Sequence, residues 1–218
     1  MPVFADVKTE NNTLIRKAID TFAAVAPYSI AAITTPFTGT TNALAALPAS
    51  YSGLGWLSDD GISLGRDVEL SEISALGSTE PVRIDTRRVA KTLTCTALET
   101  SKLTRALYYG MNPTATITPN AGGVVEYTEP DQPIPNYVRL LAYSKDETEN
   151  GEIYIVRSYP RARVTPNGEQ VWSDGDAAMS YPLLFTATKD PVLGYSVKEW
   201  QGGPGSTGLN TAMGYVGV

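Results

Sequence analysis

The stretch Ala177-Ala-Met-Ser-Tyr-Pro-Leu-Leu-Phe-Thr-Ala187 carries the clearest structural signal in this chain of 218 residues. Met179, Tyr181, Leu183 and Phe185 occur at every second position, and Ala178, Ser180 and Thr186 are at positions of the opposite parity. Successive side chains of a β-strand point to opposite faces, so this period of two predicts a strand with one face in the core. The segment indicates a mainly β protein.

Turn signals recur at short intervals along the chain, which is typical of an antiparallel β protein. Each one separates apolar runs that are short enough to be strands. The predicted turns are Ser58-Asp59-Asp60-Gly61, between strands 53–57 and 62–70; Asn150-Gly151, between strands 137–144 and 152–159; Pro166-Asn167-Gly168, between strands 161–165 and 169–172; and Asp174-Gly175, before the strand quoted above. A last strand is predicted around Leu193, Tyr195 and Val197.

A long strand and one short helix are predicted in the middle of the chain. The apolar residues of the strand over 82–98 change parity near Arg87-Arg88, which predicts a β-bulge at that point. The helix is predicted over 101–109, where Ser101 suits the N-cap, Gly110 suits the C-cap, and the apolar residues between them have helical spacing.

The N-terminal region has a different composition from the rest of the chain. Residues 23–51 are rich in alanine, threonine and proline and include no charged residue. Such a stretch is too apolar for a solvated linker, so we expect it to pack on its own domain or on a neighbouring subunit. Leu14, Ala18, Phe22 and Val25 have the spacing of a helical face, whereas residues 18–26 can also form a strand. Periodicity favours the helix, and both alternatives stay open at this point.

Together these patterns predict a mainly β fold, an antiparallel β-sandwich or barrel-like domain of about eight to ten strands with one short α-helix. We expect a single domain over residues 1–218. Residues 1–50 form an extended arm and loop region in this prediction, and residues 51–218 form the β core.

The composition excludes several classes of function. The chain has no histidine and one cysteine, Cys95, so a histidine-dependent catalytic triad, a histidine metal site and an intrachain disulfide are all excluded. With 17 Lys and Arg against 23 Asp and Glu, the net charge of −6 argues against a protein that wraps nucleic acid. The N-terminus shows no signal peptide, and we expect a protein made and retained in the cytosol as a soluble chain.

No group of residues predicts an active site, a cofactor site or a metal site. Residues 203–208 match G-x-G-x-x-G, but only ten residues follow, and a dinucleotide site needs this loop to open a helix. The acidic pairs Asp59-Asp60 and Asp174/Asp176 lie in predicted turns, where aspartate is favoured for its bonds to nearby backbone amides. Arg161 and Arg163 share a strand face, and we expect them to pair with carboxylates across a sheet or a subunit boundary. We therefore predict that the protein is not an enzyme.

The segment Gly53-Leu-Gly-Trp-Leu-Ser-Asp-Asp-Gly61 resembles a recurrent segment of the major tail proteins, or tail tube proteins, of long-tailed (siphovirus-type) bacteriophages. The resemblance extends over most of the chain, through the order of an Ala/Pro/Thr-rich entry, a long strand, a short helix and closing strands. Its further elements are Ala24-Val-Ala-Pro27, Leu44, Arg66-Asp67, Glu72-Ile-Ser-Ala-Leu-Gly77, the run from Arg83 to Leu98, Glu99-Thr100 and the run from Leu103 to Gly110. The resemblance implies that residues 18–26 form a strand rather than a helix.

This resemblance implies a structural virion protein whose copies form stacked hexameric rings around an acidic channel that conducts phage DNA during ejection. It implies as partners other copies of the chain, tail tip or initiator and tail terminator proteins, the tape measure protein, and double-stranded DNA held without sequence specificity. The implied location is the virion tail, assembled in the cytoplasm of the infected cell. The candidate subunit-interface residues are Phe37, Leu44, Tyr51, Trp56, Asp59, Asp60, Arg161 and Arg163.

One alternative function is a β-sandwich module that binds carbohydrate or a host surface through its three Trp and twelve Tyr residues. A second alternative, a hydrolase that uses only carboxylates, requires two acidic residues that face each other across a pocket.

Overall fold

The computed structural model describes residues 8, 10–39, 42–131, 136–165, 168–170, 172 and 178–215. Their regular elements are almost all β-strands, as the sequence predicts. The strands are β1 (Asp20–Pro27), β2 (Ser52–Gly53), β3 (Leu57–Ser74), β4 (Pro81–Ala97), β5 (Val138–Thr148), β6 (Gly151–Thr165), β7 (Tyr181–Ala187) and β8 (Lys198–Gly202). One α-helix, α2 (Lys102–Tyr108), and two short 3-10 helices, η1 (Asn12–Leu14) and η2 (Pro204–Ser206), complete the list.

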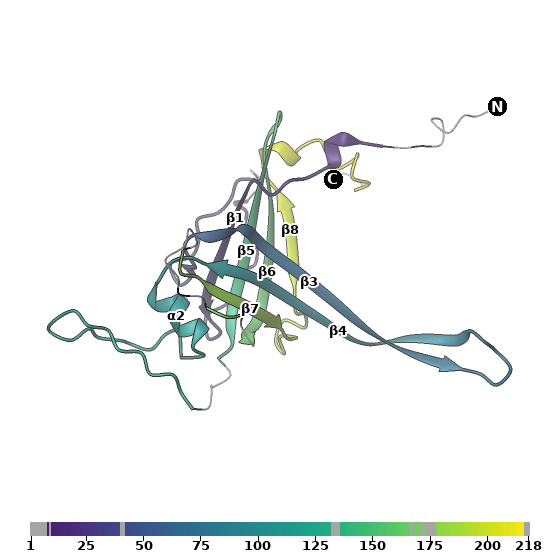
Figure 1. Cartoon of the computed structure of the whole chain (residues 1–218). Helices are drawn as coiled ribbons and strands as arrows, with labels where there is room; N and C mark the ends of the chain where they lie inside the picture. The colour runs from purple at the N-terminus through teal and green to yellow at the C-terminus, as the bar shows by residue number, and fades with distance from the viewer. Residues whose placement is uncertain are drawn as a thin grey trace.

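The eight strands form one antiparallel sheet, in which seven follow the order β2-β1-β5-β6-β7-β4-β3 and β8 pairs with β6 off this path. The long strand β6 pairs with β5 along one side and with both β7 and β8 along the other. The sheet curls so that its two ends approach each other (Figure 1). The N–H of Leu54, in the chain between β2 and β3, donates to the carbonyl of Ala23 on β1 at 2.9 Å. The result is a barrel-like sheet that stays open between β1 and β3.

The main core fills the inside of this curl. Its buried side chains come from β1, β4, β5, β6 and β7, together with Leu107 of α2 and with Leu54, which follows β2. Tyr181, Leu183 and Phe185, which alternate along β7, are at most 2% exposed, so the strand predicted from their spacing is present. It begins at Tyr181 in the described structure, and the first residue of the predicted strand, Ala177, lies outside the described residues.

A second apolar cluster covers the other face of the β1–β5 pair. It contains Ala24, Ala26, Tyr51 and Leu141, and it is covered by Ile30, Ile33 and Leu47 from the chain between β1 and β2. β1 is therefore buried on both faces, with Ala23 and Val25 in the main core and Ala24 and Ala26 in the second cluster.

This double burial explains why the helix suggested by the spacing of Leu14, Ala18, Phe22 and Val25 is wrong and the alternative strand is confirmed. A continuous apolar run fits a strand with core on both sides as well as it fits a helix. The ladder to β5, which pairs all eight residues of β1, decides between them.

The predicted turn at Ser58-Asp59-Asp60-Gly61 is wrong, because these residues lie inside the continuous strand β3. Leu57 pairs with Ala97 and Ile62 pairs with Cys95, so the four residues between them bulge opposite Thr96. Gly61 has a φ of +68°, and the bulge therefore uses the left-handed conformation that the sequence analysis assigned to a turn.

The other predicted turns and strands have mixed outcomes. The hairpin at Asn150-Gly151 and the helix at 101–109 are confirmed, and β4 has the predicted bulge, since Glu69 pairs with Arg88 while Leu70 pairs with Thr86. No strand forms at the described residues of 169–172, and the last strand lies at 198–202 rather than at 193–197, where the chain turns back on itself around Asp190. Pro166-Asn167 and the Asp174-Gly175-Asp176 stretch lie outside the described residues.

Cys95 offers a test of the main core. Its side chain is 2% exposed, and burial raises the pKa of the thiol to about 12. Because the thiolate is the reactive form, we expect no modification of native protein by a maleimide at pH 7 and rapid modification in urea. Fast labelling under native conditions, followed by mass spectrometry, would contradict the position of β4 in the core.

Candidate assembly surface

β3 and β4 extend far beyond the rest of the molecule as a two-stranded ribbon (Figure 1). We call residues 65–90 of this ribbon the β3–β4 arm. Nearly all of its side chains are exposed, in contrast to the inner ends of the same strands, where Leu93 and Cys95 are buried. An isolated two-stranded ribbon is at best marginally stable in water, so an arm of this length is expected to have a partner in its working state.

One face of the arm, called its apolar face below, carries most of the apolar side chains of the arm. In the observed register Leu64 pairs with Leu93 and Val68 pairs with Val89, and Leu70 and Ile84 continue the same face beyond the bulge. All of these side chains except Leu93 are exposed, Leu70 by 51% and Ile84 by 53%. The inner end of this face is the core lining itself. Farther out, the Arg66–Lys91 pair separates Leu64 from Val68, and Glu72 lies opposite Ile84, so apolar and charged side chains alternate along this face of the arm.

The opposite face of the arm is polar. It includes Asp67, Glu69 and Ser71 of β3 and Arg88 of β4. The bulged Arg87 forms an exposed ion pair with Glu69 at 3.2 Å. The arm is therefore amphipathic in part. One side is polar apart from Ile73, and the other combines most of the apolar side chains of the arm with Arg66, Lys91 and Glu72.

The outer edge of β3 is unpaired. β3 ends the strand order and pairs only with β4 among the strands of the described sheet. Its 18 residues leave a long row of backbone donors and acceptors, and such an edge is a template for pairing with another chain.

The body of the sheet presents a second distinctive face, opposite the main core. In one row across the strands, Ser63 pairs with Thr94, Thr94 with Leu184, and Leu184 with Thr165. In the next row Gly65, Thr92, Thr186 and Arg163 follow one another. We call this surface of β3, β4, β7 and the end of β6 the hydroxyl face. Its residues are exposed or half-buried, and Arg163 is the one charged residue in these two rows.

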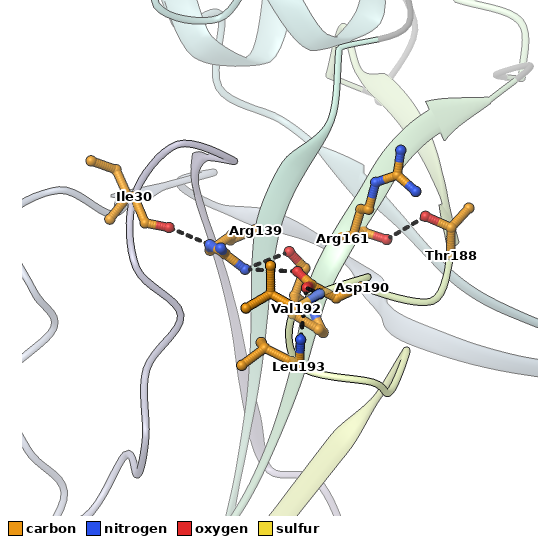
Figure 2. A network of polar contacts seen from close by, with 8 residues as sticks. Ile30, Arg139, Arg161, Thr188, Asp190, Val192 and Leu193 are labelled. Atoms are coloured by element: carbon orange, nitrogen blue, oxygen red, sulfur yellow. Dashed lines mark hydrogen bonds and ion pairs between the residues drawn. The ribbon is translucent and has the colours of Figure 1, made fainter.

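A buried ion pair fixes the chain segments on the far side of the sheet. The Arg139 guanidinium on β5 contacts the Asp190 carboxylate at 3.3 Å and donates hydrogen bonds to the carbonyls of Pro160 and Ile30 (Figure 2). Asp190 is 0% exposed and accepts further bonds from the amides of Val192 and Leu193, at 2.8 and 3.0 Å. The pair therefore connects β5, the chain after β1, the end of β6 and the turn at 190–193.

Burial alone would raise the pKa of Asp190. The amides of Leu193 and Val192, together with Arg139, outweigh that effect and hold the pKa below its ordinary value. The carboxylate is thus ionised at neutral pH and satisfied by its partners, which is the arrangement that a buried charge requires. We assign it a structural role, because every partner named is part of the same chain.

The eight candidate interface residues fall into different environments. Tyr51 is 6% exposed in the second cluster, and Phe37 is half-buried against Gly202, where an added Cβ would lie 2.8 Å from its ring. Leu44 is half-buried. Trp56 is 78% exposed, and Asp59 and Asp60 are both exposed in the bulge of β3.

The two arginines of this set occupy different positions. Arg161 lies over the ring of Tyr137 at 3.8 Å, and its backbone carbonyl accepts a hydrogen bond from the Thr188 hydroxyl at 3.2 Å (Figure 2). The Nε of Arg163 is buried and has no hydrogen-bond partner in the structure. The ion pairs of the described residues include neither arginine, so their expected pairing across a subunit boundary stays a prediction.

The structure brings Asp59, Asp60 and Trp56 together at the start of β3, and it places the arginines at the end of β6. The apolar face of the arm and the Arg139–Asp190 pair were not identified from the sequence. Within the described part of the chain, no three metal-ligating side chains cluster, and none of the helices could cross a membrane.

Comparison with known proteins identifies the family. The family model described as "Phage tail tube protein" matches residues 8–200. The chain belongs to the phage tail tube protein family. It is therefore a structural subunit of a tail tube, and its working state is an assembly of copies of itself, as the resemblance seen in the sequence implied.

The other comparisons add less. A solved structure titled "Crystal structure of Hcp protein" is similar at 8% sequence identity and a TM-score of 0.34, and the match covers 83% of this chain and 97% of that one. No curated protein sequence matches this tail tube protein.

Proposed function

We propose that this tail tube protein forms stacked hexameric rings whose continuous channel conducts phage DNA during ejection. The unpaired 18-residue edge of β3 is the observation that carries this proposal. A ring lets each β3 edge pair with the next subunit, which removes the open edges that a single chain leaves exposed. The amphipathic arm gives the same contact an apolar surface to bury.

In this proposal the hydroxyl face lines the channel. It lies opposite the main core, on the same strands whose edge would join neighbouring subunits. Threonine and serine side chains offer no cluster of cations that would hold phosphate, and the net charge of −6 per copy amounts to −36 for six copies. A polyanion is repelled by such a ring rather than retained, which suits a conduit.

We further propose that the whole chain acts as one tail tube domain, that residues 1–50 contribute contacts to neighbouring subunits, and that its function requires no catalysis and no cofactor. The proposed partners in the tail are the initiator at the tip, the terminator, the tape measure protein, and then double-stranded DNA in the channel. Assembly would take place in the cytoplasm of the infected cell.

Negative-stain electron microscopy of the concentrated protein, fresh and after prolonged incubation, tests the proposal. We expect rings or hollow tubes with a regular axial repeat. Subunits that stay unassembled at high concentration, even with the tail initiator present, would contradict it.

A carbohydrate-binding module is the second candidate, because Trp56 and Trp172 are 78% and 77% exposed. Exposed indole rings suit sugar recognition as well as subunit contacts. Saturable binding in a glycan screen, lost on replacement of Trp56 and Trp172 by alanine, would favour this function over the tube.

A further inference from the structure

The tip of the β3–β4 arm is an exposed apolar turn. The Ser78 amide donates to the Ala75 carbonyl at 3.1 Å, and Gly77 has a φ of +86°, which closes a tight turn. Leu76 occupies the corner and is fully exposed. Corners of such turns usually hold proline or polar residues, so a leucine there indicates a contact that the single chain does not supply.

A matching hollow lies on the body of the same chain. It is lined by Phe22, Leu44, Leu47 and Tyr143, has a volume of about 290 Å³, and has Asp20 and Lys145 at its polar side. We call it the Phe22 hollow. Phe22, 37% exposed, packs against Tyr143 with 6.0 Å between ring centroids. The hollow continues the second apolar cluster past the point where Leu47 covers it, so its walls are already apolar before any partner arrives.

The arm cannot place its tip in the Phe22 hollow of its own chain. Residues 65–76 of an extended strand span about 35 Å at roughly 3.3 Å per residue. Figure 1 shows the arm running straight away from the body, with the tip at its far end. A contact between the two features therefore requires a second copy of the chain.

We propose that Leu76 of one copy docks in the Phe22 hollow of the next. This inference rests on the proposed assembly into rings or tubes and identifies one of its contacts. A projection and a socket at different places on one chain form a heterologous contact, which propagates from subunit to subunit and produces rings or filaments rather than closed pairs. Self-assembly of the tail tube family makes another copy the natural occupant.

A second hollow, of about 250 Å³, is the alternative socket. Its walls include Ile62 and Leu64, which belong to the strand that forms the arm of the same chain. Ala142, a residue of the main core, lines this second hollow, whereas Phe22 lines the first. The second hollow therefore lies on the core-facing side of the β1–β5 pair, opposite the Phe22 hollow. The base of a chain's own arm thus borders this second hollow, whereas the Phe22 hollow is free of it.

Disulfide crosslinking tests the docking directly. Purified Leu76→Cys and Leu44→Cys proteins are mixed and oxidised under native conditions, and linked peptides are identified by mass spectrometry. All three variants also carry Cys95→Ala, because Cys95 is the cross-strand partner of Ile62 and would otherwise compete for a cysteine at position 62. We expect a 76–44 link between copies and none when Leu76→Cys is mixed with Ile62→Cys. A 76–62 link without a 76–44 link would overturn the assignment of the socket.

Substitution at the tip gives an independent readout. Leu76→Asp is expected to raise the protein concentration needed for assembly at least about tenfold, the effect of losing one buried leucine. Thr79→Asp, which adds the same charge to the same exposed tip, should leave that concentration nearly unchanged. The docking alone would be contradicted if Leu76→Asp formed normal tubes and if the Leu76→Cys and Leu44→Cys proteins gave no 76–44 link. Failure of the unsubstituted protein to assemble in any form would instead contradict the proposed function.

Discussion

Leu70→Asp is expected to abolish assembly of the tail tube protein while leaving the single subunit folded. Leu70 is 51% exposed on the apolar face of the arm, so its replacement costs the monomer little. In the proposed assembly the same face is buried against another copy, and a carboxylate buried there without a partner would cost several kcal/mol at every contact. Repeated along a tube, that cost prevents growth. Sedimentation velocity and electron microscopy at matched concentrations measure the effect.

Ser71→Asp is the matched control for this experiment. Ser71 is the next residue along β3, equally part of the arm, and its side chain lies on the polar face. Adding the same charge one position away should therefore leave tubes intact. Loss of assembly with both variants would show that charge on the arm matters and its face does not. Normal tubes with Leu70→Asp would show that the apolar face is not part of the interface.

Asp190→Ala is expected to destabilise the subunit by about 3–5 kcal/mol, because it leaves the Arg139 guanidinium buried without its counter-ion. The Val192 and Leu193 amides also lose their acceptor. Urea unfolding of the unassembled protein, followed by tryptophan fluorescence, measures the difference. Asp85→Ala is the control, since the exposed Arg83–Asp85 pair should contribute about 0–1 kcal/mol. Equal losses in the two variants would contradict the structural role of the buried pair.

The stability that Asp190 contributes depends on pH, because its pKa is lowered in the folded protein. A carboxylate whose pKa is lower in the folded state contributes stability above the ordinary aspartate value of about 3.9. That contribution is lost as the pH falls through the pKa of the folded state. The gap in unfolding free energy between the unsubstituted protein and Asp190→Asn should therefore be largest near pH 7 and narrow below about pH 4. A difference in unfolding free energy that increases as the pH falls would contradict the lowered pKa of Asp190.

Much of the fold could be predicted from the sequence, because its signals are local. The alternation through Tyr181, Leu183 and Phe185 and the cap residues of α2 each depend on a few neighbouring positions, and both predictions are confirmed. The helix-or-strand ambiguity of β1 had a physical origin, since burial on both faces removes the alternation that would have distinguished them. The bulge at Gly61 was interpreted as a turn because the two features use the same residue types.

The candidate assembly surface was harder to predict. The shared parity of Ile62, Leu64, Val68 and Leu70 was visible in the sequence, but the same pattern describes a buried strand, and only the structure shows that its outer half leaves the body. Arg139 and Asp190 lie 51 positions apart, so no local pattern relates them. Phe37 and Tyr51 were candidates because they lie in an uncharged stretch, and the structure places both against the chain's own sheet and strands.

Cryo-electron microscopy of the assembled protein tests the central claim most directly, since it shows the position of every strand edge. The account predicts a hollow tube of stacked six-fold rings in which the outer edge of β3 is hydrogen-bonded to a neighbouring subunit and the hydroxyl face lines the channel. An assembly in which β3 keeps a free edge facing solvent, or in which the hydroxyl face lies on the outside, would contradict it.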